Sequence, residues 1–206
     1  MDYIKLKKLY NKQKPLIVKK LNEFRNIYRG KNLNRIFEEL CYCILTANWK
    51  AKESIEIQKE IRDGFEKWSK TKLKKYLKNK GHRFWPQRAE YIVKARKYKK
   101  FLREIIKLPY QEVREWLTKN IKGIGYKEAS HFLRNIGLGE NIAILDRHIL
   151  KNLKKYGIIK EVPKSLSSRK YIEIENKMKL FSKKIKIPIS HLDLLFWSKE
   201  TGEILK

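Results

Sequence analysis

The fold is decided by the stretch Ile121-Lys122-Gly123-Ile124-Gly125-Tyr126-Lys127. Apolar-periodic segments precede and follow it, so the pattern predicts a helix, a glycine hairpin over 121–125 and a second helix. Gly123 and Gly125 permit backbone conformations with positive φ and allow a ligand to approach the bare chain. Backbone amides in such a turn bind phosphate groups. A turn that only caps a helix is the alternative.

The rest of the chain also follows a helical pattern. Its five prolines and nine glycines fall mostly between apolar-periodic segments, and the alternation typical of β-strands is scarce. We predict an all-α protein that forms a single unit over residues 1–206. One or two helices are expected within 3–28, interrupted at Pro15. Further helices are expected over about 33–47, 51–65, 70–79, from Pro86 with an apolar stripe that reaches Ile105, 110–119, from the hairpin to near Gly137, 146–156, 168–183 and 188–199.

The composition indicates a polyanionic partner. Lys and Arg total 51 against 22 acidic residues, which gives a formal net charge of +29. Because the basic residues are spread along the whole chain, solubility is a second explanation for part of the excess. The sequence has no apolar run long enough to span a membrane and no signal-peptide core at its start, so an intracellular location is expected.

The two cysteines predict neither a disulfide nor a metal site. Cys41 and Cys43 are two positions apart in a predicted helix, so they do not face each other, and both are expected in the core. A cluster held by four cysteines is impossible within the chain. We therefore expect no metal and no organic cofactor.

Lys127 and Asp146 are the predicted reactive pair. Lys127 begins the helix after the hairpin, and a helix N-terminus disfavours a cation. A lysine must lose its proton to act as a nucleophile, so this position suits amine catalysis. Asp146 is a natural N-cap of the next helix, and a capped carboxylate stays fixed and can stabilise positive charge that develops on a substrate.

Residues 33–150 resemble the helix-hairpin-helix DNA glycosylase superfamily, whose hairpin usually reads Leu-Pro-Gly-Val-Gly-x-Lys. In this chain Lys122 replaces the proline, which adds a phosphate-facing charge. The resemblance implies two helical lobes, approximately 33–125 and 1–32 plus 126–206, with an active-site cleft between them. It also implies binding of a DNA backbone by Gly123, Gly125, Lys122 and His148.

The resemblance further implies the chemistry. The matching lysine attacks C1′ of a damaged nucleotide and expels the base, with help from the aspartate. A Schiff base then forms, and β-elimination nicks the strand. Lys127 and Asp146 occupy these two positions.

The lesion is inferred from two segments. The branch that excises thymine glycol normally carries a cluster on four C-terminal cysteines, which are missing from 171–206. The stretch from Cys43 to Trp49 resembles the 8-oxoguanine branch, where an asparagine fills the gap left by the flipped base. Asn48 matches this asparagine, although it could simply end a helix. The short archaeal type of this branch ends in a lysine, as does this chain at Lys206.

A flipped purine needs a stacking surface and hydrogen bonds at its edge. The candidates for this base pocket are Trp197 as the stacking residue, His131 one turn after Lys127, Asp193, and the C-terminal Lys206. Each has a structural alternative: Trp197 and His131 as packing residues, Asp193 as a surface acid, and Lys206 as part of a frayed end.

The loop Gly81–Arg88 suggests a wedge. Phe84 and Trp85 lie between basic residues, and an inserted aromatic holds a duplex bent. Arg83 or Arg88 could reach the opposite base or a phosphate. The alternative is that both aromatics close the core.

We expect a monomeric enzyme that acts on duplex DNA containing 8-oxoguanine. Three alternatives remain open: a glycosylase and lyase for oxidised pyrimidines, a non-catalytic hairpin module that binds DNA, and a basic helical protein that binds RNA.

Overall fold

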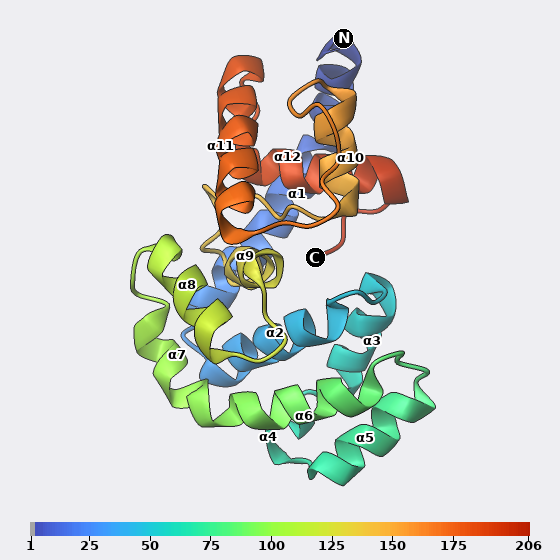
Figure 1. Ribbon diagram of the computed structural model, residues 1–206, viewed down its shortest axis with the longest axis vertical. Helices are drawn as coiled ribbons and strands as arrows, with labels where there is room; N and C mark the ends of the chain where they lie inside the picture. The colour runs from blue at the N-terminus through green and yellow to red at the C-terminus, as the bar shows by residue number, and fades with distance from the viewer. Residues whose placement is uncertain (1–2) are drawn as a thin grey trace.

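The computed structural model describes residues 3–206, and this part of the chain is built from helices and contains no strand, as predicted (Figure 1). The elements are α1 (Tyr3–Arg29), α2 (Leu33–Thr46), α3 (Ala51–Ile61), α4 (Gly64–Lys67), α5 (Lys70–Asn79), α6 (Trp85–Ala95), the 3₁₀ turn η1 (Arg96–Tyr98), α7 (Lys99–Ile105), α8 (Tyr110–Asn120), α9 (Tyr126–Asn135), α10 (Arg147–Lys155), α11 (Ser168–Ile185) and α12 (Ile189–Thr201). None of the helices described is both long enough and apolar enough to cross a membrane.

Three predicted helices were wrong in their bounds. The single helix predicted from Pro86 to Ile105 is divided into α6 and α7 by the 3₁₀ turn η1. α1 runs through Pro15 without interruption, because Pro15 is exposed and buried residues on both sides, Tyr10 and Ile17 among them, anchor one face of the helix. The helix predicted over 51–65 ends at Ile61, where Arg62 turns the chain with φ of 45° and donates its N–H to the Gln58 carbonyl. Gly64 begins the short α4 and does not end α3.

The buried apolar residues form two clusters. The first is built around α2 and contains Leu40, Phe65, Leu117 and Phe132. The second joins α1 to α10, α11 and α12. In Figure 1 these three helices and the start of α1 lie at the top, α2 to α8 lie below, and α9 lies between the two groups. The C-terminus also lies between the groups, which places the end of the chain beside the site described below.

The first cluster also contains both cysteines. Cys41 and Cys43 are fully buried free thiols on α2, as predicted. Burial raises the pKa of both thiols, so they stay protonated and pack as small apolar side chains.

The hairpin between α8 and α9 is anchored from beneath. Ile121 and Ile124 are buried, whereas Lys122 and Gly125 are exposed. Gly123 has φ of +85°, and a Cβ atom built there would lie 2.5 Å from the Tyr91 ring. Only glycine fits this combination of backbone conformation and close contact.

α11 fixes the segment that leads into α10. The backbone N–H of Leu145 donates to the Tyr171 hydroxyl at 3.1 Å, and this hydroxyl donates to the Ala143 carbonyl at 2.7 Å. Asp146 follows directly and caps α10, since its Oδ1 accepts from the Ile149 N–H at 2.8 Å. The predicted N-cap is confirmed.

Candidate active site

A cavity of about 1010 Å³ opens between the two groups of helices. It is lined by the turn after α2, the start of α9, the segment leading into α10, one face of α12 and the last two residues of the chain. The predicted residues that line it are Asn48, Arg83, Phe84, Lys127, His131, Asp146, His148, Asp193, Trp197 and Lys206. Asn48 and Lys206, which are 158 positions apart in the sequence, therefore line one cleft.

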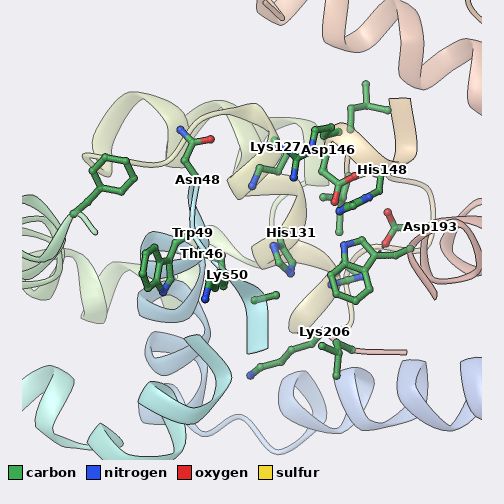
Figure 2. Close-up of a pocket in the computed structure, with 18 of the residues that line it drawn as sticks. Thr46, Asn48, Trp49, Lys50, Lys127, His131, Asp146, His148, Asp193 and Lys206 are labelled. Carbon is green, nitrogen blue, oxygen red and sulfur yellow. Dashed lines mark hydrogen bonds and ion pairs between the residues drawn. The ribbon is translucent and has the colours of Figure 1, made fainter. Parts of the chain in front are cut away.

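Lys127 and Asp146 both line this cleft. In the view of Figure 2, Lys127 lies between Asn48 and Asp146, and His148 lies beside Asp146. Lys127 comes from the first turn of α9, and Asp146 is the N-cap of α10. An amine and a carboxylate thus line the same cavity, as amine catalysis with charge stabilisation requires.

Glu128 contacts both the hairpin and Lys127. Its Oε2 accepts from the Gly125 N–H at 3.2 Å, and its Oε1 lies 2.9 Å from Lys127 Nζ. The Lys127 side chain is 27% exposed, so the amine remains accessible from the cleft.

His131 lies one turn after Lys127 and is buried, yet its ring borders the cavity. Burial, together with the positive charges of Arg134, Lys127 and Lys206, holds the pKa of His131 well below its usual value. The imidazole is therefore neutral and carries one donor and one acceptor. Its Nε2 atom is buried and has no hydrogen-bond partner within the described residues. The ring packs edge-on against Tyr42, with centroids 5.5 Å apart.

Asp193 is buried and is not a surface acid. Its Oδ2 lies 2.7 Å from Nη1 of Arg134. Burial raises the pKa of Asp193 to about 6, although Arg134 acts in the opposite direction; the charge of Asp146 adds to the increase. This carboxyl can therefore change its protonation state near neutral pH.

Lys206 is held in place by partners from α2 and α3. Its Nζ lies 2.7 Å from Oε1 of Glu39 and also donates to Gln58. The hydroxyl of Tyr42 donates to the Lys206 carbonyl at 2.8 Å. Burial lowers the pKa of the Lys206 amine, and Glu39 opposes this effect. The last residue of the chain is therefore packed in a buried socket, and its end borders the cavity (Figure 2).

The remaining residues predicted for the cleft lie around its rim. Trp197 is half-buried and contacts His148 edge-on, with ring centroids 6.1 Å apart. Asn48 is exposed and left-handed, with φ of 57°, directly after the C-cap of α2. Phe84 is half-buried at the cavity wall, and Arg83 is exposed beside it.

Five predicted residues do not line the cavity. Trp85 packs against the first core cluster, and Arg88 is buried and donates to the Ala47 carbonyl at 2.6 Å. Gly123, Gly125 and Lys122 form the hairpin next to the cleft and not its wall.

Comparison with known proteins identifies the family. The family described as 8-oxoguanine DNA glycosylase matches residues 17–187. The chain belongs to this family. An 8-oxoguanine DNA glycosylase/AP lyase of Methanocaldococcus jannaschii is 48% identical over 205 residues, which cover 98% of each chain.

Solved structures agree with this assignment. A crystal structure of the Methanocaldococcus jannaschii 8-oxoguanine glycosylase/lyase in complex with a 15mer DNA containing 8-oxoguanine has a TM-score of 0.94 and 46% identity, and the match covers 99% of each chain. The 8-oxoguanine DNA glycosylase of Thermotoga maritima has a TM-score of 0.94 and 37% identity, with 99% of this chain and 98% of that chain covered. The helix-hairpin-helix glycosylase fold predicted from the sequence is confirmed.

The structure of this 8-oxoguanine DNA glycosylase family member also contains site residues that the sequence analysis missed. They are Glu39, Gln58, Glu128 and Arg134, which hold predicted residues in place, and Thr46, Trp49 and Lys50, which line the cavity. The sequence did contain a signal for Glu39, because this acid lies on α2 among core positions that include Phe37 and Leu40. An acid among core positions is rarely buried unless it is paired.

Proposed function

We propose that this chain excises 8-oxoguanine from duplex DNA and then nicks the strand at the resulting abasic site. The observation that carries the proposal is the meeting of Lys127 and Asp146 in one cleft with His131, Trp197 and Lys206. The names of the relatives, 8-oxoguanine DNA glycosylase/AP lyase, agree with this assignment.

The DNA backbone is bound at the hairpin. The amides of Gly123 and Gly125 take a phosphate, Lys122 adds charge, and His148 contacts a second phosphate beside the flipped nucleotide. The exposure of Lys122 and Gly125 and the net charge of +29 support this role. Recognition of the lesion must come from contacts to the damaged base, since phosphate contacts alone carry no sequence information.

The opposite strand is held by the other rim of the cleft. Asn48 enters the space vacated by the flipped base, and Phe84 acts as the wedge, with Arg83 at the opposite base. The exposure of Asn48 and the position of Phe84 at the cavity wall support these roles. Trp85 and Arg88 act from behind, since Arg88 lies over the Phe84 ring at 5.5 Å and Trp85 packs into the core.

The flipped base is bound inside the cavity. Trp197 stacks on the purine, and the unpaired Nε2 of the neutral His131 offers one hydrogen bond. Asp193 and the C-terminal Lys206 complete the pocket. Their burial and fixed partners support a rigid recognition surface, which a pocket that separates two similar purines requires.

The chemistry begins at Lys127. Its deprotonated amine attacks C1′, the bond from C1′ to the base breaks, and the electron pair leaves with the base, which takes up a proton. Asp146 stabilises the positive charge that develops on the sugar. The sugar ring then opens to give a Schiff base between Lys127 and C1′. Loss of a C2′ proton expels the 3′ phosphate and cuts the strand.

The enzyme acts as a monomer with two lobes. The membership of the two core clusters supports a boundary near Ala143, because Phe132 and Ile142 belong to the first cluster and Ala143 to the second. This boundary follows α9 and not the hairpin at 121–125.

The test is borohydride trapping on a duplex that contains a single 8-oxoguanine. Wild-type protein should form a covalent complex on damaged DNA and none on undamaged DNA, whereas Lys127→Gln should bind the duplex but form no complex. A Lys127→Gln protein that keeps excision would remove the proposal in favour of another nucleophile. Parallel duplexes with oxidised pyrimidines, and an RNA of equal length, test the alternative substrates.

A further inference from the structure

Glu128 connects the phosphate-binding hairpin to the proposed nucleophile. One carboxylate oxygen accepts from the Gly125 N–H at 3.2 Å, and the other lies 2.9 Å from Lys127 Nζ. The Glu128 side chain is only 14% exposed, so the protein and not the solvent holds this carboxylate. The Glu128 carboxylate therefore contacts the Gly125 amide and the Lys127 amine at the same time.

We propose that Glu128 is a positioning residue that holds Lys127 in the DNA-free protein and releases it when a DNA phosphate binds the hairpin. This inference rests on the proposed function, in which the Gly125 amide binds that phosphate. The Gly125 N–H can donate a full hydrogen bond to only one anion. A phosphate beside the Glu128 carboxylate is also repelled by its like charge. Because both contacts use the same carboxylate, displacing it from Gly125 also breaks its ion pair with Lys127.

The surroundings of Glu128 offer the displaced carboxylate another partner. Burial lowers the pKa of the Arg88 guanidinium, and the charge of Glu128 opposes this effect. Arg88 lies directly behind the hairpin, with Nη1 3.2 Å from the position of a Cβ atom at Gly123. A shift of Glu128 toward Arg88 thus keeps its carboxylate near a positive charge and releases the Lys127 amine from its ion pair.

Other acids near the hairpin lack this double contact. Glu115 accepts from the Tyr126 hydroxyl, and Asp146 caps α10. Within residues 3–206, the ion pair of Lys127 is with Glu128. Glu115 therefore provides a matched control, because Glu115→Gln removes the same charge near the same hairpin and leaves Lys127 untouched.

The experiment compares Glu128→Gln and Glu115→Gln with wild type in three measurements. Glutamine at this helix position still accepts from the Gly125 amide, so the fold is kept and a melting curve checks it. The first measurement is reductive methylation of Lys127 in the DNA-free protein, with Lys122 as internal reference. The second is the Kd for a duplex with a tetrahydrofuran abasic analogue, and the third is the single-turnover rate of 8-oxoguanine excision at saturating protein.

For Glu128→Gln we expect Lys127 methylation to rise about two- to fivefold relative to Lys122, as loss of a partly exposed ion pair predicts. The Kd should fall by roughly the same factor. For Glu115→Gln the Kd can fall, but the methylation ratio should not change.

Two results would overturn the inference. An unchanged methylation ratio in Glu128→Gln would show that Glu128 does not restrain the amine. A large loss of excision rate at saturation would show that Glu128 acts during the chemical step and is not released. Failure of the proposed function has a different signature, which is wild-type protein that is not trapped on 8-oxoguanine DNA, and it leaves the methylation ratio unaffected.

Discussion

The Nζ atom of Lys206 lies 2.7 Å from Oε1 and 3.0 Å from Oε2 of Glu39, so the last residue of the chain is paired with a carboxylate on α2 that is 1% exposed. Glu39 also accepts from Gln58 at 2.9 Å and from Asn135 at 3.1 Å. This network fixes an end that would fray in most proteins and holds it at the cavity.

Glu39→Gln should weaken recognition of the damaged base. The change leaves the Lys206 ammonium without its charged partner, so the C-terminal residue should shift, and 8-oxoguanine excision should fall by about tenfold, as loss of one charged hydrogen bond predicts. Cleavage of a preformed abasic site should fall much less, because that substrate has no base. Single-turnover rates on the two duplexes give the ratio of 8-oxoguanine excision to abasic-site cleavage. Glu38→Gln is the control, since Glu38 pairs with the exposed Arg35; an equal ratio in both variants would argue against the prediction.

Asp193→Asn should change how stability depends on pH. Burial raises the folded-state pKa of Asp193 to about 6, so the folded protein binds a proton that the unfolded chain has already lost at that pH. The stabilisation from this group is complete below the unfolded pKa of about 4 and is lost as the pH rises through about 6. The free energy of unfolding of wild type should therefore fall relative to Asp193→Asn by up to about 3 kcal/mol between pH 4 and pH 7. Urea titrations at several pH values measure this difference; curves that remain parallel would contradict it.

Gly123→Ala should weaken DNA binding. A methyl group at this position lies 2.5 Å from the Tyr91 ring, at φ of +85°, so the hairpin or the Tyr91 ring must move. We expect about a tenfold rise in the Kd for an abasic-analogue duplex, which corresponds to loss of roughly one good phosphate hydrogen bond. Gly81→Ala is the matched control, because Gly81 also has positive φ, at +69°, but a Cβ atom there meets nothing within 4 Å. Both variants should lose about 1 kcal/mol of stability from the backbone conformation alone, and only Gly123→Ala should lose affinity.

Glu175→Gln should destabilise the fold. Arg114 and Glu175 form an ion pair whose side chains are 3% and 2% exposed, with Nη1 and Oε2 2.9 Å apart. Removal of one partner leaves a buried guanidinium uncompensated, at a cost of roughly 3–5 kcal/mol. Glu173 lies two residues earlier on α11, on another face of the helix, in exposed pairs with Lys170 and Lys177, and Glu173→Gln should change stability little. Thermal melting of the two variants compares them directly; similar melting temperatures would show that the buried pair contributes no more than the exposed ones.

The sequence predicted the local features of the site well where one turn of chain determines them. The hairpin glycines, the N-cap at Asp146 and the buried cysteines on α2 follow from backbone conformation, capping and helical periodicity. The continuous α1 was missed because propensity argues for a break at Pro15, whereas packing on both sides of it keeps the helix intact.

The helical class, the hairpin and the N-cap at Asp146 follow from the sequence alone, because each depends on residues within a few positions of one another. Tertiary structure alone decided which distant residues meet. In the folded protein Asp193 pairs with Arg134, and Lys206 pairs with Glu39. Arg88 is buried and lies over the Phe84 ring. Such contacts depend on how the helices pack. Helical periodicity shows which face of a helix is buried, but it does not show which other helix packs against that face.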